Sequence, residues 1–240
     1  MFKFNLRYLV IVHYWLLLFS LLLLWFPRPW LRFGGRIFRL PSRPPVERSQ
    51  RDSGDVSLRL ADELQNLRNW IDLLRSAAGS IAVFGMQIGF VRIPGCFELM
   101  NGAPKITADV IFIIQCVIFV AAILIQTTRN FQERVTLVAP IFFLFGVSFG
   151  IIGPLTALFA CIAVWVVNLL LPSSSVFLLV FAGLEVVFAK FLSSGANSYT
   201  RTLIIAVALT LLPVLLSAMF NRRLVKLNKK ARVRVSNSKS

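Results

Sequence analysis

The sequence has few acidic residues, one histidine and few cysteines. Its 240 residues include 10 Asp and Glu, one His and three Cys. Cys96, Cys116 and Cys161 form no CxxC pair, so neither a zinc site nor a disulfide framework is expected. Any histidine-based metal site or catalytic triad would have to use His13. We therefore expect no metal and no other cofactor.

Several motifs that carry enzyme chemistry are absent as well. The sequence has no G-x-x-x-x-G-K-[ST] loop for phosphate and no H-E-x-x-H for zinc. It has no Asp-x-Asp pair to hold Mg²⁺. Beyond residue 98 the acids are Asp109, Glu133 and Glu185, which leaves few candidates for a mechanism with two carboxylates. We therefore expect a protein that is not an enzyme.

Apolar residues are what the sequence has in abundance. Hydrophobic residues make up 57% of the chain and charged residues 15%, whereas a soluble domain is nearer to one quarter charged. The apolar residues gather in runs of roughly 20, the length that a helix needs to cross a bilayer. This pattern predicts an all-α bundle that crosses a plasma or bacterial inner membrane several times.

The net charge of +16 is concentrated beside the apolar runs. Seven of the 26 basic residues lie between Arg28 and Arg51, and eight lie between Arg222 and Lys239. Basic flanks of this kind are typical of the cytoplasmic side of a membrane protein. We therefore expect them to bind anionic lipid headgroups and not nucleic acid.

Composition divides the chain into five segments. We expect a transmembrane anchor at 1–26, a basic linker rich in Pro and Arg at 27–54, an amphipathic helix at 55–78, a transmembrane bundle at 79–220 and a cytoplasmic tail at 221–240. The run Leu137–Leu171 is too long for one crossing, so Gly153-Pro154 is predicted to divide it into two helices.

The segment 55–78 has the spacing of a surface helix with one apolar seam. The seam residues recur at intervals of four and three: Leu60, Leu64, Leu67, Ile71, Leu74 and Ala78. This pattern predicts a seam that packs on the bundle or recruits a partner helix.

The number of crossings depends on the segment Ser76–Val91. Without it the chain has six spans, and the basic linker is forced to the outside. With it the chain has seven spans, the linker lies in the cytoplasm and the N-terminus lies outside. We favour seven because seven basic residues in the linker outweigh Lys3 and Arg7. Six spans remain the alternative because Ser76–Val91 is only weakly apolar.

Three polar residues in or beside apolar runs are candidate functional groups. Glu185 lies midway through Val176–Leu192, where a carboxylate needs a partner, water or a proton. Lys190 is five residues further on and is expected to extend toward the membrane surface rather than pair with Glu185. His13 lies in the first apolar run, where it could form an interhelical hydrogen bond or have a functional role.

Two further sets of residues have a predicted role. Gly146, Gly150 and Gly153 belong to a small-residue stripe that lets helices approach closely. Four charged residues near a predicted membrane boundary are candidate headgroup contacts or an ordinary solvated loop: Arg92, Glu98, Lys105 and Asp109.

The sequence favours a scaffold or accessory subunit of a membrane assembly, with another membrane protein or a second copy as partner. A small transporter or channel component with Glu185 on its path is the alternative. A membrane-embedded lipid enzyme ranks third.

Overall fold

The computed structural model describes eight stretches of the chain. These are residues 10–27, 67–88, 91–100, 103–131, 134–171, 173–192, 198–220 and 224. The predicted linker, the first part of the helix predicted at 55–78 and almost all of the tail lie outside them.

The described residues are predominantly helical, as the sequence predicts. The helices are α1 (Tyr14–Trp25), α4 (Leu67–Phe84), α5 (Lys105–Thr127), α6 (Ile141–Ile151), α7 (Pro154–Val167), α8 (Ser174–Leu192) and α9 (Ser198–Met219), with a 3₁₀ turn at Asn168–Leu170. Six short strands add to the expected all-α fold: β1 (Val10–Val12), β2 (Met86–Ile88), β3 (Val91–Ile93), β4 (Phe97–Leu99), β5 (Thr128–Phe131) and β6 (Arg134–Leu137). They form the antiparallel pairs β1–β4, β2–β3 and β5–β6.

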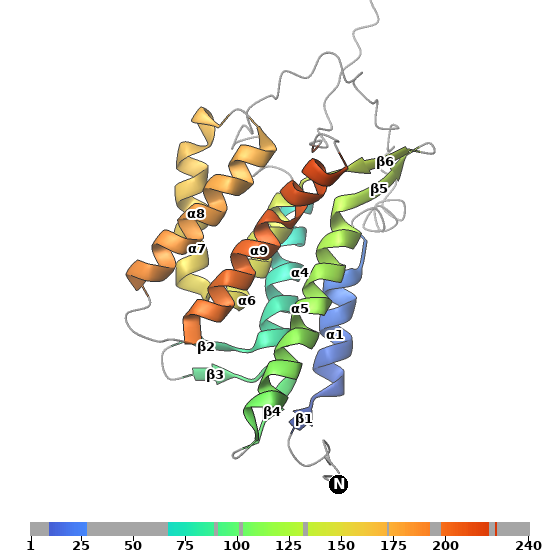
Figure 1. Cartoon of the computed structure of the whole chain (residues 1–240), viewed down its shortest axis with the longest axis vertical. Coiled ribbons are helices and arrows are strands. Elements are labelled where there is room, and N and C mark those ends of the chain that lie inside the picture. The colour runs from blue at the N-terminus through green and yellow to red at the C-terminus, as the bar shows by residue number, and fades with distance from the viewer. Residues whose placement is uncertain are drawn as a thin grey trace, which may run out of the picture.

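The strand pairs mark the two ends of an elongated bundle (Figure 1). The pairs β1–β4 and β2–β3 lie at one end, here called the β1 end, and β5–β6 lies at the other, the β5 end. Helix α1 leaves the β1 end, α4 returns to it, and α5 runs from it to the β5 end. The α6–α7 turn and the start of α9 border one cavity with β2–β3, so they also lie at the β1 end. Successive helices therefore alternate in direction.

Within the described part of the chain, three helices are long and apolar enough to cross a membrane. They are α5, α8 and the stretch Thr200–Met219 of α9. Helices α1, α6 and α7 are apolar but have 12, 11 and 14 residues, less than the roughly 20 that a crossing needs. Neither the seven-span count nor the six-span count is supported by helix length.

The segment Ser76–Val91 is not the seventh span that the sequence suggested. Its first part belongs to α4, which ends at Phe84, and its second part enters the β2–β3 pair. Gly85 makes this turn with φ +74°, a conformation that favours glycine. The first apolar run is likewise shortened, because residues 10–12 pair with β4 instead of joining α1.

The predicted division at Gly153-Pro154 is confirmed. Helix α6 ends at Ile151 and α7 begins at Pro154. Gly153 has φ +87°, and proline suits the first position of a helix because it has no amide hydrogen to leave unpaired.

Helix α4 packs against α6 along its length, but the face that it buries is not the predicted one. The seam points outward: Leu67 is 72% exposed and Leu74 is 63% exposed, and Ile71 and Ala78 are exposed as well. The buried face is polar or small, and consists of Asn69, Asp72, Arg75, Ser76, Gly79, Ser80, Ala82 and Val83. The expectation that the seam packs on the bundle is therefore wrong for residues 67–78.

The small residues of α6 explain this orientation. A Cβ atom at Gly146 would lie 2.7 Å from the Ala77 nitrogen, and one at Gly150 would lie 2.7 Å from the Ile81 nitrogen. The two backbones are thus in close approach, which leaves room for the short side chains of Ser76 and Ser80 and none for leucine. Gly153 does not take part, because a Cβ there would meet nothing within 4 Å.

Candidate functional site

Glu185 is held at the junction of three helices. Its side chain comes from α8, is 0% exposed and accepts two hydroxyl hydrogen bonds. Ser148 Oγ on α6 donates to Oε1, and Thr210 Oγ1 on α9 donates to Oε2 over 3.2 Å. Burying a carboxylate is costly unless it is hydrogen-bonded, and both oxygens of this one have a partner.

Aromatic rings enclose Glu185 on the side facing the β5 end. Phe145 and Phe181 lie about one helical turn toward that end from Ser148 and Glu185, and their ring centroids are 4.6 Å apart. Phe177 lies 5.4 Å from Trp165, and both rings pack on Phe145. The described residues therefore place an apolar layer between the carboxylate and the β5 end.

Ser148 also lies at the centre of a G-x-S-x-G run, Gly146–Gly150, which our sequence analysis passed over. In hydrolases this motif places a serine on a sharp turn between a strand and a helix. Here Ser148 lies inside α6, is 2% exposed and also has its hydroxyl 3.1 Å from the Leu144 carbonyl oxygen. His13 is outside the bundle core, before α1. The run therefore matches the sequence motif of a nucleophile elbow but lacks the sharp turn between a strand and a helix.

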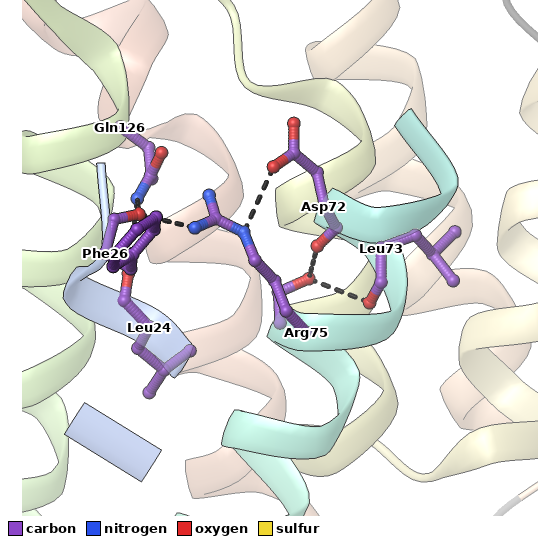
Figure 2. Close-up of polar contacts among 7 residues, drawn as sticks. Leu24, Phe26, Asp72, Leu73, Arg75 and Gln126 are labelled. Carbon is purple, nitrogen blue, oxygen red and sulfur yellow. Dashed lines mark hydrogen bonds and ion pairs between the residues drawn. The ribbon is translucent and has the colours of Figure 1, made fainter. Parts of the chain in front are cut away.

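A second buried polar group, here called the Arg75 group, consists of Asp72, Arg75 and Gln126 and binds the end of α1 (Figure 2). The Arg75 guanidinium lies with Nε 3.0 Å from Asp72 Oδ1 and donates through Nη1 to the Phe26 carbonyl. Gln126 Nε2 on α5 donates to the same carbonyl over 2.9 Å and to the Leu24 carbonyl over 3.3 Å. These donors satisfy carbonyl groups that the last turn of a helix leaves unpaired.

The Arg75 group connects four helices. Asp72 and Arg75 belong to α4, Gln126 to α5, and the accepted carbonyls to the end of α1. The Arg75 guanidinium also lies 5.5 Å from the centre of the Phe143 ring on α6, within the range of a cation–π contact. This group was not predicted, because nothing in the residue spacing indicates that α4 buries its charged face.

His13 and Glu98 meet at the β1 end, although they are far apart in the sequence. His13 precedes α1 instead of lying within a span, and its Nε2 is 3.6 Å from Glu98 Oε2. Pairing of β1 with β4 brings them together, with Ile11 opposite Glu98 and the His13 amide 2.9 Å from the Cys96 carbonyl.

The remaining predicted headgroup residues lie in separate places. Asp109 Oδ1 accepts from Arg201 Nη1 over 2.7 Å, which links the starts of α5 and α9 in a largely exposed ion pair. Arg92 lies in β3, and Lys105 is the exposed first residue of α5. Lys190 is exposed in the last turn of α8, whereas Glu185 faces the core.

The β1 end also contains a cavity of about 350 Å³. Its walls come from the α4–β2 turn, β3, β4, the α6–α7 turn and the start of α9. Glu98 lines it, and Glu185 does not. The described residues contain no group of three or more His, Cys, Asp or Glu side chains placed to hold a metal ion.

The described residues define a class of protein, a mostly helical bundle in which three helices are long and apolar enough to cross a membrane. Comparisons with protein-family models, with curated proteins and with solved structures find no match to this chain.

Proposed function

We propose that the chain is a multi-pass membrane protein that acts as a non-catalytic scaffold or accessory subunit of a membrane assembly. The enclosure of Glu185 carries this proposal. Its two oxygens are bound by Ser148 and Thr210, and its side chain is 0% exposed. A carboxylate on a transport path needs access to water or to the transported ion, whereas this one joins α6, α8 and α9.

The Arg75 group supports the same proposal. The Asp72–Arg75 pair and Gln126 bind the end of α1, which is apolar on the side that faces away from the bundle. The most deeply buried charges of the described chain thus act between helices, where they stabilise one arrangement of the bundle. A rigid bundle with an apolar exterior suits lateral contact with other membrane proteins.

We further propose that the β5 end faces the cytoplasm. Helix α1 ends and α4 begins on that side, and α9 also ends there. In the sequence the basic linker follows α1 and the basic tail follows α9. This orientation satisfies the positive-inside tendency for both basic segments. A reporter attached near Ser49 that is active only in the cytoplasm should be active. Activity only on the outer side would overturn the orientation.

Flux measurements separate the scaffold from the transporter. In proteoliposomes with a pH gradient or a K⁺ gradient, wild type and Glu185→Gln should both leak no faster than empty vesicles. The chain extracted from its own membranes in mild detergent should migrate in an assembly larger than one chain. Flux that disappears in Glu185→Gln would replace the scaffold proposal with the transporter, and migration as a single chain would also count against the scaffold.

A further inference from the structure

Backbone contacts fix the shape of the cavity at the β1 end. Gly85 and Gly95 lie so close that a Cβ at either would meet backbone atoms at 2.7 Å. The Cys96 amide donates to the Ala82 carbonyl over 2.7 Å, and the Gly85 amide donates to the Ile81 carbonyl over 2.7 Å. The walls are therefore held by backbone contacts, and a ligand would enter a cavity that already has its shape.

The charge of the cavity favours a cation. Among the lining residues that the structure describes, Glu98 is the one that carries a charge. Helices α4 and α6 end at the cavity and α7 and α9 begin beside it, so the partial charges of their termini oppose one another and the Glu98 carboxylate sets the sign of the charge. The basic residues Lys105 and Arg201 lie at the starts of helices near this end, and neither lines the cavity.

The walls around Glu98 expose more polar than apolar surface, with Phe84, Phe97 and Ile93 as apolar side chains among them. The volume of about 350 Å³ is at the lower end of the range for small-molecule sites. An ammonium group is attracted both to a carboxylate and to the face of an aromatic ring.

Two neighbours of Glu98 fit this assignment. His13 lies 3.6 Å from the carboxylate and limits the positions that it can take. Burial raises the pKa of the nearby Cys96 thiol to about 11, so this thiol stays protonated at neutral pH and is not a nucleophile.

We propose that this cavity binds a small organic ammonium cation, with the Glu98 carboxylate as its counter-charge. The site goes beyond the scaffold role and does not depend on it. Its ammonium could belong to a free amine or to the headgroup of a lipid in the outer leaflet.

Calorimetric titration of the full chain in an uncharged maltoside detergent tests the site. Benzylamine is the cationic probe, and benzyl alcohol and benzoate are its neutral and anionic counterparts. Benzylamine should bind wild type, and Glu98→Gln should weaken binding at least tenfold, since the charge partner is lost. Asp109 is an acid at the same end that does not line the cavity, so Asp109→Asn should bind benzylamine as wild type does.

A second variant keeps the test decisive if Glu98→Gln does not fold. Ile93→Trp fills part of the cavity while retaining Glu98, and it should also abolish binding. Equal binding of benzylamine to wild type and Glu98→Gln, or of benzylamine and benzoate to wild type, would overturn the proposal. If added phosphatidylethanolamine competes with benzylamine, a lipid headgroup is the source of the ammonium. If it does not compete, the source is a free amine.

Discussion

Helices α4 and α6 pack side by side, yet they have opposite compositions. Helix α6 is apolar on all sides and is buried from Ile141 to Ser148. Helix α4 contains Arg68, Asp72 and Arg75, and its outward face is the most apolar part of it. In a water-soluble protein the apolar face of such a helix would be expected to turn inward.

The comparison indicates that helix contacts here depend on side-chain size and on hydrogen bonding. In the proposed membrane setting, lipid would solvate leucine as well as a protein interior does, so an apolar seam would gain little by turning inward. Small residues allow the close approach of α4 and α6, and the buried charges of Asp72 and Arg75 have their partners inside the bundle.

The largest expected effect follows from breaking the close approach of the two helices. Gly150→Leu should destabilise the bundle by about 3 kcal/mol or more, because even the Cβ would meet the backbone of α4. Unfolding of the purified chain in detergent, followed by circular dichroism, measures the change. Gly183→Leu is the matched control, since a Cβ at this position on α8 meets nothing within 4 Å. Equal losses would show that the packing of α4 on α6 does not depend on Gly150.

An effect of similar size is expected from removing one charge of the buried pair. Asp72→Ala leaves the Arg75 guanidinium buried without its carboxylate, which should destabilise the chain by about 3–5 kcal/mol. Asp109→Ala removes the acid of an exposed pair and should have an effect of at most about 1 kcal/mol. If the two variants unfold at the same denaturant concentration, the charged face of α4 is not buried as described.

The smallest effect is expected on the outward seam. Leu74→Ala should change the free energy of unfolding by no more than about 0.5 kcal/mol, because its side chain is exposed. Leu144→Ala, a buried residue of α6, should cost about 2–5 kcal/mol under the same conditions. A loss at Leu74 as large as that at Leu144 would restore the inward seam that the sequence spacing suggested.

Much of the helical framework could be predicted from the sequence. Apolar runs predict the long helices α5, α8 and α9, and Gly153-Pro154 predicts the break between α6 and α7. These features are local, since they depend on the hydropathy of consecutive residues and on the backbone preferences of glycine and proline. The strand pairs were not predicted, because each has at most four residues per strand and β1–β4 joins segments that are far apart in the sequence.

The sequence by itself determined the class of protein, the helical framework and the identity of Glu185 as an unusual residue, because these depend on composition and short spacing. Only the tertiary structure decided what each polar group contacts. The partners of Glu185 are 37 and 25 residues away, and Gln126 reaches a carbonyl 100 residues away. The orientation of α4 was decided in the same way, because Gly146 and Gly150 of another helix select the face that can approach them. This selection depends on contacts between two helices, which form only when the chain folds.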